Sequence, residues 1–439
     1  MQRSSELVAR PTQSFDPCPD NGPVSKLEAF NRQTIGRLPQ WRGLPRALRE
    51  EVLLASRIFP FRVSRYVCDE LIDWRAVPDD PIFRLLFPMR EMLPAGYAAR
   101  LEELEQVRAP RAAFRLALND AWAEMNPHPA GQTDNVPTLD GEPVDGLQHK
   151  YRETVLVFPR EGQTCHAHCT YCFRAPQFLP LEGEAKFQVD HVESMIRYLK
   201  RHEEVSSVLI TGGDPMVMRA RSLTRYIEPL LELEHITSIR IGSKSLGFYP
   251  QVVTRDVDAG AKLRLFERIT RSGRHLAFMT QFSHPREMET SEVERAIAAI
   301  RSTGGVLRSQ SPVLRRINDR AEDWRRLWDL QVKLGVVPYY FFQARNTGSE
   351  DYFQLSLSRA LDIFQDAYRQ VTGLGRTVRG VVMSAYDGKV QIVGRSEIAG
   401  EPVFVLKFLQ ARDPDRVGDV FFARQSETAK WVDELELAS

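Results

Sequence analysis

The sequence predicts an α/β protein in which parallel β/α units follow a helical N-terminal region. Short apolar runs rich in β-branched and aromatic residues recur as TVLVF (154–158), SVLIT (207–211), SIRIGS (238–243), LAFMTQF (276–282), GVLRSQS (305–311) and VPYYFFQ (337–343). Amphipathic segments such as VESMIRYLKRH and SEVERAIAAIRSTG separate these runs. Six strands that alternate with helices favour parallel units, in either an open doubly wound sheet or a partial barrel.

The chain divides into five parts. Residues 1–24 are polar, contain four prolines and are expected to form a flexible tail. Residues 25–125 space apolar side chains three and four apart, as helices do, and residues 126–150 form a connector rich in Pro, Gly, Asn and Asp. The β/α core takes residues 151–350. Residues 351–439 follow as a C-terminal part, with strands at RGVVMSA, KVQIVG and PVFVLKF and a closing helix near TAKWVDELEL.

Composition excludes several classes of protein. The 439 residues include 59 Lys and Arg against 58 Asp and Glu, a formal net charge of +1, so no basic surplus indicates binding to nucleic acid or to a membrane surface. No segment approaches the ~20 apolar residues that cross a bilayer. The first residues, MQRSSELVAR, lack the apolar core of a signal peptide. We therefore expect a cytoplasmic protein without a membrane or nucleic-acid partner.

Five cysteines are present, and this odd number argues against a disulfide framework. Cys18 and Cys68 stand alone, whereas Cys165, Cys169 and Cys172 cluster in the segment TCHAHCTYCFR. Five cysteines placed at random rarely gather so tightly. The sequence therefore predicts a site at this segment.

Two kinds of metal site fit the three clustered cysteines. Three thiolates on a short loop can hold three irons of a cubane cluster and leave the fourth iron open. The alternative is a structural zinc ion held by the three cysteines and either His166 or His168. Structural zinc loops usually take ligand pairs from two separated segments, and the sequence offers no second pair.

The polar signals of the predicted core fall at the C-terminal ends of its strands. The cysteine segment follows the first run, TGGDP (211–215) closes the second and IGSK closes the third. Chemistry in a β/α barrel takes place on this face, so we expect a single site there. In TGGDP, the glycines permit close approach of the backbone, and Asp214 can accept a hydrogen bond from an ammonium group.

The CxxxCxxC spacing, with Tyr171 before its last cysteine and with TGGDP behind the next strand, resembles the radical S-adenosylmethionine superfamily. Over roughly residues 70 to 425 the sequence resembles the lysine 2,3-aminomutase family, in the phrases DDPIFRLLFP, EPVDGLQHKY, TGGDPMVM, RIGSK, TQFSHPREM, QSPVLRRIND and VPYYFFQ. This resemblance implies a partial (β/α)6 barrel of the radical S-adenosylmethionine type, with a helical N-terminal region and a small C-terminal extension. It also implies a [4Fe-4S] cluster at which S-adenosylmethionine is cleaved to a 5′-deoxyadenosyl radical.

The resemblance also assigns roles to individual residues. Cys165, Cys169 and Cys172 match the cluster ligands, and Tyr171 matches a position near the adenine. The remaining residues that match the S-adenosylmethionine site are Gly212, Gly213 and Asp214 at the methionine, and Ser243, Lys244, Gln281 and Gln310 at the ends of strands that line the pocket.

Pyridoxal phosphate is the second cofactor that the resemblance implies. In the mutases a lysine after a run of glycines forms the internal aldimine, and Lys389 matches this lysine. The loop is shorter here and keeps only Gly388. An Asp-Gly pair before a strand is also an ordinary hairpin turn, which would leave the lysine solvated.

The phosphate-binding segment of the family is altered as well. Lys150 and Tyr151 match positions that bind or face the coenzyme. Thr154 stands where the family has an arginine, and Arg152 is the residue that we expect to compensate.

Substitutions at the substrate positions indicate which amino acid is bound. Arg174 matches the arginine that pairs with the substrate carboxylate, and its planar guanidinium suits that role. Two aspartates grip the ε-ammonium in the lysine enzymes, and here Arg345 and Ser384 take their places. Because a cation cannot bind an ammonium group in a confined site, the sequence predicts a substrate with an acidic or polar distal end, such as glutamate.

The sequence therefore predicts a 2,3-aminomutase that uses S-adenosylmethionine, a [4Fe-4S] cluster and pyridoxal phosphate. The alternatives are a lysine 2,3-aminomutase proper, a related enzyme that lacks pyridoxal phosphate or performs elimination or epimerisation, and a non-catalytic metal protein. The near-zero net charge disfavours a radical enzyme that modifies nucleic acid. Expected partners are an amino-acid substrate, an electron donor such as flavodoxin or ferredoxin, and further copies of the chain in a homo-oligomer.

Overall fold

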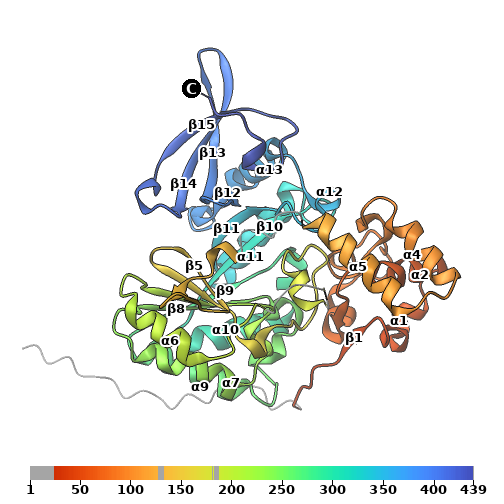
Figure 1. Ribbon diagram of the computed structural model, residues 1–439, viewed down its shortest axis with the longest axis horizontal. Helices are drawn as coiled ribbons and strands as arrows, with labels where there is room; N and C mark the ends of the chain where they lie inside the picture. The colour runs from red at the N-terminus through yellow and green to blue at the C-terminus, as the bar shows by residue number, and fades with distance from the viewer. Residues whose placement is uncertain (1–23, 127–132, 180, 182–186, 439) are drawn as a thin grey trace, which may run out of the picture.

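An eleven-stranded sheet organises the computed structural model, which describes residues 24–126, 133–179, 181 and 187–438. Its strands are β5 (Leu147–Tyr151), β6 (Thr154–Val157), β7 (Ser207–Ile210), β8 (Ser238–Ser243), β9 (His275–Thr280), β10 (Val306–Val313), β11 (Val337–Gln343), β12 (Arg379–Ser384), β13 (Gly388–Ile398), β14 (Glu401–Ala411) and β15 (Val420–Arg424). Each strand pairs with its neighbour in the chain, so the order in space follows the order in sequence (Figure 1).

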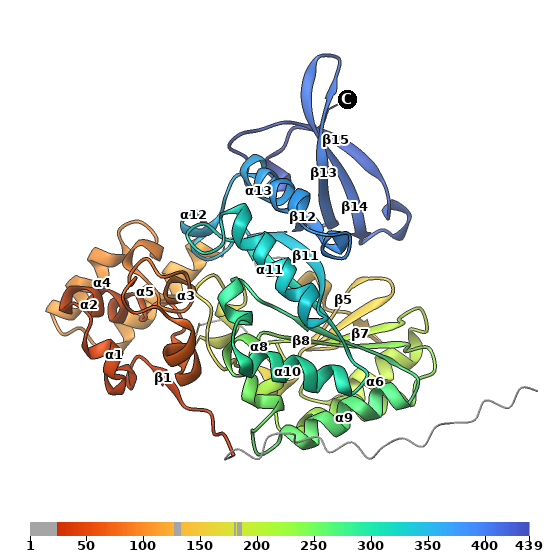
Figure 2. The same ribbon diagram turned by 180° about the vertical axis from the view of Figure 1, so that it is seen from behind.

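The central strands form an incomplete barrel. Strands β6 to β12 are parallel, and none of them is reordered, which excludes the doubly wound alternative. Strands β5 to β14 surround a single cavity, which confirms the predicted partial barrel. The connecting helices lie outside it (Figure 2) and are α6 (Val192–Arg201), α7 (Ala220–Leu231), α8 (Ser245–Phe248), α9 (Ala259–Arg271), α10 (Ser291–Ser302), α11 (Ala321–Leu334), α12 (Glu350–Phe353) and α13 (Leu357–Gln370). No helix in the described segments is long and apolar enough to cross a membrane.

The sequence encodes the inner and outer faces of the barrel by alternation. In β8, Ile239 and Ile241 are buried, while Arg240 and Gly242 on the other face line the cavity. The helices carry start and stop signals of their own. Thr290 caps α10 by accepting a hydrogen bond from Val293, and Gly335 ends α11 with a φ of 75°.

The N-terminal region packs beside the barrel and is mostly helical, as predicted (Figure 1). It contains β1 (Ala29–Asn31), α1 (Pro39–Arg42), α2 (Arg46–Ala55), β2 (Arg62–Ser64), α3 (Pro81–Leu86), α4 (Tyr97–Gln106) and α5 (Arg111–Met125). Two of its backbone carbonyls hold the cysteine segment: Arg62 accepts from the His168 amide at 2.8 Å, and Leu85 accepts from the Thr170 amide at 2.9 Å. The region therefore supports the loop on which the predicted cluster depends.

The connector and the tail differ in how far the structure describes them. The connector holds a short hairpin of β3 (Thr138–Leu139) and β4 (Glu142–Pro143) before β5 begins. The expected flexible tail lies outside the described residues, except for residue 24.

The C-terminal part departs from the prediction in two ways. The sheet continues past residue 350, because β12 joins as a seventh parallel strand and β13 to β15 extend it antiparallel. The helix predicted near TAKWVDELEL is wrong, since only a short 3-10 turn forms at Val432–Glu434. The carbonyls of Ala429 and Lys430 instead accept from Leu357 and Gln343 at 2.8 and 3.0 Å. Contacts with α13 and β11 thus outcompete helical hydrogen bonds.

Candidate active site

A cavity of about 370 Å³ lies at the C-terminal ends of the parallel strands. All the site residues predicted from the sequence line it: Lys150, Tyr151, Cys165, Cys169, Tyr171, Cys172, Arg174, Gly212, Gly213, Asp214, Ser243, Lys244, Gln281, Gln310, Arg345, Ser384 and Lys389. The structure therefore brings the predicted residues together around one cavity.

The cysteine segment forms a loop after β6. Burial raises the pKa of all three thiols, most strongly at Cys165, whose carbonyl accepts a hydrogen bond from Arg62 at 3.1 Å. Among the described residues, no three His, Cys, Asp or Glu side chains are grouped around one metal ion. A cubane cluster does not require such a group, since each of its thiolates binds a different iron.

His166 and His168, the histidines of the zinc alternative, face different surroundings. His166 shares a hydrogen bond of 2.7 Å with Ser245, and burial lowers its pKa to about 3. The ring of His168 lies 5.4 Å from that of Phe178, and burial lowers its pKa to about 4. Both imidazoles are therefore neutral at pH 7.

The glycine turn after β7 docks against the start of the cysteine loop. The Asp214 amide donates to the Thr164 carbonyl at 2.8 Å. A Cβ on Gly213 would lie 2.4 Å from that same carbonyl oxygen, and Gly212 has a φ of 134°. Only glycine fits this backbone approach, so the two glycines join the turn to the cysteine loop.

Asp214 is committed to contacts within the protein. Its buried carboxylate accepts from the Ser243 hydroxyl at 2.8 Å, the Ser245 hydroxyl at 2.9 Å and the amides of Lys244 and Met216, both at 2.9 Å. The sequence led us to expect that this group accepts from a ligand ammonium. In the structure both carboxylate oxygens are already occupied, so Asp214 fixes the end of β8 against the glycine turn.

Lys244 forms a buried ion pair that sequence reasoning missed. Its Nζ lies 2.8 Å from Glu287 Oε2 and also donates to the Ser283 hydroxyl at 3.1 Å. Glu287 is fully buried; burial raises its pKa, and the Lys244 charge opposes that rise. The signal was the acidic residue in the phrase TQFSHPREM, but no local pattern shows that a lysine 43 residues earlier is its partner.

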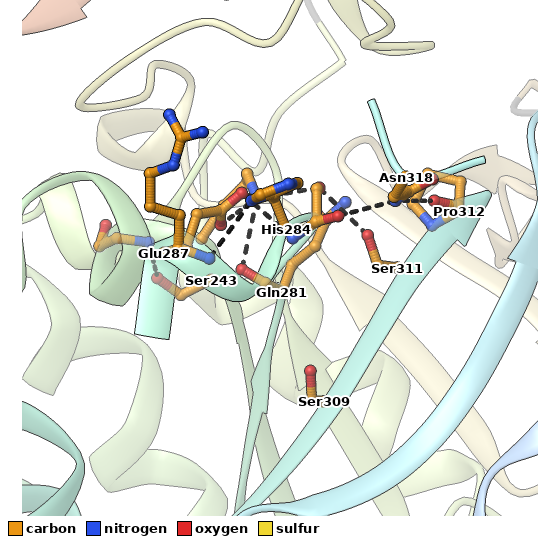
Figure 3. A network of polar contacts seen from close by, with 12 residues as sticks. Ser243, Gln281, His284, Glu287, Ser309, Ser311, Pro312 and Asn318 are labelled. Atoms are coloured by element: carbon orange, nitrogen blue, oxygen red, sulfur yellow. Dashed lines mark hydrogen bonds and ion pairs between the residues drawn. The ribbon is translucent and has the colours of Figure 1, made fainter. Parts of the chain in front are cut away.

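Figure 3 shows this network continuing across the strand ends toward β10. The Gln281 amide donates to the Tyr171 hydroxyl, which also lies 3.3 Å from the Ser283 hydroxyl. Ser311 donates to Ser283 at 3.1 Å, and Asn318 Nδ2 donates to the Ser283 carbonyl at 2.7 Å. The side of the cavity formed by β7 to β10 is therefore fixed by internal hydrogen bonds.

Lys389 enters the opposite side of the cavity from the start of β13. Its Nζ donates to Gln410 Oε1 at 2.7 Å and lies over the rings of Tyr340 and Tyr151, 5.1 and 5.4 Å from their centroids. Burial lowers the pKa of this lysine to about 7, and nearby cations, Arg240 first, add to the effect. A Cβ on Gly388 would lie 2.2 Å from the Gln410 carbonyl, so this glycine allows β13 to pair closely with β14.

Lys150 joins β5 to the residue that follows β12. Its Nζ donates to the Ala385 carbonyl, and burial, with Arg345 and Arg412 nearby, lowers its pKa to about 7; Asp387 opposes this shift only in part. Tyr151 lies next to it, and burial raises the pKa of that phenol to about 12 while Ser384 opposes the rise.

Two arginines lie against the ring of Phe173 in the cavity. The guanidinium carbons of Arg174 and Arg345 are 5.2 and 4.4 Å from the centroid of its ring. Arg174 donates to the Gly212 carbonyl at 3.3 Å, and neither arginine forms an ion pair within the described residues. Burial lowers the pKa of each to about 10, so both remain cations at pH 7.

These features define the class of the protein. An incomplete parallel barrel with a three-cysteine loop after its first parallel strand and a glycine turn after its second is that of a radical S-adenosylmethionine enzyme. The chain belongs to the lysine 2,3-aminomutase family, as it is 30% identical over 392 residues to a protein of Aquifex aeolicus named "Putative L-lysine 2,3-aminomutase", covering 89% of this chain and 91% of that protein. Membership implies S-adenosylmethionine and a [4Fe-4S] cluster.

Other comparisons give more distant matches. An L-lysine 2,3-aminomutase of Fusobacterium nucleatum is 25% identical over 331 residues, which cover 75% of this chain and 74% of that protein. A crystal structure of a radical SAM methyltransferase from Sphaerobacter thermophilus matches with a TM-score of 0.37 and 16% identity, over 64% of this chain and 92% of that one. No family model matches the sequence.

Proposed function

We propose that the protein is a 2,3-aminomutase that moves the amino group of an acidic or polar amino acid, with glutamate the simplest case, from C2 to C3. The proposal combines radical chemistry at the cysteine loop with pyridoxal phosphate on Lys389. It is carried by one observation: the guanidiniums of Arg174 and Arg345 both lie against Phe173 in the cavity, and neither has a carboxylate partner among the described residues.

A dicarboxylate substrate satisfies both arginines. Arg174 would bind the α-carboxylate, and Arg345 would bind the distal carboxylate, each through its planar pair of N–H donors. Lysine would instead bring its ε-ammonium to a buried cation, and like charges in a confined site repel strongly. The charge of the cavity therefore supports an acidic substrate over lysine.

The chemistry of the donor set supports the cluster and S-adenosylmethionine. Three buried thiols on one loop fit three irons of a cubane, with Cys165, Cys169 and Cys172 as the ligands. The turn at Gly212 and Gly213 and the strand ends with Tyr171, Gln281 and Gln310 form the neighbouring wall, where the cosubstrate would lie. Asp214, Ser243 and Lys244 would shape this wall from behind, through the contacts described above. An external electron donor, such as a flavodoxin or ferredoxin, would supply the electron.

The other wall supports pyridoxal phosphate. A lysine with a pKa near 7 is partly unprotonated at neutral pH and can act as a nucleophile, as Lys389 would toward the coenzyme aldehyde. Tyr151 and Tyr340 supply aromatic surfaces beside it. A bound phosphate would favour the protonated form of Lys150, which then adds positive charge. The residues present therefore fit the coenzyme.

When bound, the cluster would supply the electron that cleaves S-adenosylmethionine, and the pyridoxal coenzyme would carry the migrating nitrogen. The chain's own residues hold the substrate in place. Arg174 and Arg345 would fix its two ends, and the Phe173 ring would support both guanidiniums. Ser384, paired with Lys389 across β12 and β13, would keep that lysine in position. Holding the reacting carbon in one orientation is a large part of what such a site contributes to catalysis.

Anaerobic turnover of the reconstituted enzyme tests the proposal. Glutamate, glutamine, aspartate, lysine and arginine are offered separately, with 5′-deoxyadenosine release and mass spectrometry of the β-amino acid as readouts. We expect turnover of acidic or amide substrates. We also expect Arg345→Asp to lower kcat/KM for them by about 100-fold or more, as loss of a buried charge contact does.

Arg152→Asp is the matched control, because Arg152 is exposed and does not line the cavity, so its kcat/KM should stay close to that of the wild type. Turnover of lysine alone would overturn the proposed substrate. Absence of a covalently bound coenzyme in the wild type, or its persistence in Lys389→Ala, would overturn the role of pyridoxal phosphate.

A further inference from the structure

Arg240 is a cation of the cavity that the proposed function leaves without a task. It comes from β8 and lines the cavity, and its Nη2 donates to the Thr154 hydroxyl at 3.4 Å. Its Nε is buried without a hydrogen-bond partner, and within the described chain it forms no ion pair with a carboxylate. A half-buried guanidinium in this state destabilises the fold unless a ligand pairs with it.

Lys389 is a second cation near Arg240. Burial lowers the pKa of Lys389, and the charges of Arg240, Lys150 and Arg379 add to this shift. Tyr339 and Tyr340 also line the cavity, and their phenols oppose the lowering of the Arg240 pKa by burial. No carboxylate is among the groups that shift the pKa of Arg240. This corner of the cavity therefore has the charge that a dianionic group requires.

The position of Arg240 explains how the chain tolerates threonine at 154. The resemblance to the aminomutases places an arginine there, and Arg152 was the expected substitute. Arg152 is exposed, and its carbonyl lies 3.0 Å from the His149 ring, so that expectation is not supported. Thr154 pairs with Ser207 on β7, and Ser207 pairs with Ser238 on β8, so the Arg240 side chain reaches back across β7 to Thr154.

We propose that Arg240 binds the phosphate of pyridoxal phosphate, from β8, in the place that an arginine at position 154 would occupy. This inference rests on the proposed function, since it assumes that the coenzyme binds at Lys389. The guanidinium is suited to this role, because its N–H donors can contact two phosphate oxygens at once. Lys150 adds a point charge from β5.

Affinity for two forms of the coenzyme tests the inference without any need for turnover. The dissociation constants of pyridoxal phosphate and of unphosphorylated pyridoxal are measured through the absorbance of the lysine-bound form, in the wild type and in Arg240→Met. We expect Arg240→Met to weaken the binding of pyridoxal phosphate about 100-fold, as loss of a charged partner does. The dissociation constant of pyridoxal should change less than about 3-fold. Arg152→Met should change neither constant, because Arg152 is exposed.

A second variant shows whether position 154 and Arg240 serve the same phosphate. Adding Thr154→Arg to Arg240→Met should restore at least 10-fold of the lost affinity for pyridoxal phosphate. Arg240→Lys keeps the charge but loses the planar fork, so it should give an intermediate loss. It also stands in for Arg240→Met if that chain does not fold.

The outcomes separate the two proposals. If Arg240→Met weakens the binding of pyridoxal phosphate and of pyridoxal equally, or changes neither, then Arg240 does not bind the phosphate. The proposed function stands in that case. If the wild type binds neither compound covalently, the proposed function fails, and the inference about Arg240 fails with it. Competition by inorganic phosphate against pyridoxal phosphate in the wild type, and its loss in Arg240→Met, would support the phosphate contact directly.

Discussion

The two sides of the cavity differ in whether their charged side chains are paired within the protein. On the side formed by β7 to β10, Asp214 accepts from four different residues, and Lys244 is paired with the fully buried Glu287. On the other side, formed by β5 and the strands from β11 to β13 and joined by the Arg240 side chain, the cations Lys150, Arg240, Arg345 and Lys389 form no ion pair with a carboxylate in the described part of the chain. We call these the paired side and the cationic side.

This difference distinguishes charged residues that hold the fold together from charged residues that are available to a ligand. A buried charge that the protein itself satisfies holds strand ends in place and is available to no ligand. A buried cation without a carboxylate weakens the fold and is retained where an anion binds. On this criterion, Asp214 and Lys244 shape the site, whereas Arg345 and Lys389 have the free charge that the proposed substrate and coenzyme would require.

Breaking the ion pair on the paired side should have the largest effect. Glu287→Gln leaves the Lys244 ammonium buried without a counter-charge, so we expect the free energy of unfolding to fall by about 3 to 5 kcal/mol. Chemical denaturation of the chain without bound cofactors measures this fall. Lys244→Met combined with Glu287→Leu removes both charges and should recover much of the loss. A fall below about 1 kcal/mol in Glu287→Gln would contradict the comparison.

The cationic side should make stability depend on pH. Lys389 has a pKa of about 7 in the folded chain and about 10.4 when unfolded. Between these two pH values the unfolded chain binds more protons than the folded chain. The contribution of Lys389 to the free energy of unfolding therefore grows as the pH rises, and it is lost as the pH falls toward 7. Below about pH 7 both states are protonated and this contribution no longer changes.

Lys389→Met isolates this effect in phosphate-free buffer without coenzyme. Between pH 7 and 10, its unfolding free energy should rise less steeply than that of the wild type, by up to about 1.4 kcal/mol per pH unit. Lys200→Met, which removes an exposed lysine of α6, should keep the wild-type slope. Parallel slopes for the wild type and Lys389→Met would show that burial does not lower the pKa of Lys389.

The smallest effect is expected at Arg345. Arg345→Met removes a half-buried cation that has no carboxylate partner among the described residues, but it also removes the contact with the Phe173 ring, so the two changes oppose each other. We expect the free energy of unfolding to stay within about 0.5 kcal/mol of the wild type or to rise, measured by the same denaturation. A fall of more than about 2 kcal/mol would mean that Arg345 stabilises the fold and belongs to the paired side.

Local patterns predicted most of the fold and which residues line the cavity. The six parallel strands stand where their apolar runs indicated, because β-branched runs between amphipathic segments leave little choice of element. The predicted site residues line one cavity because parallel strands bring their C-terminal ends together. The C-terminal helix was wrong, because the carbonyls of Ala429 and Lys430 bind distant partners that no local pattern shows.

The sequence by itself determined which residues meet, through strand order and the spacing of the cysteines, since both depend on neighbours along the chain. Only the tertiary structure decided which of these residues are already satisfied. Asp214 accepts a hydrogen bond from Ser243 at the end of β8, and Lys244 pairs with Glu287, more than forty residues away. Arg240 donates to Thr154 across a strand. Whether a charge is paired depends on burial and on long-range contacts, and neither is a property of a local segment.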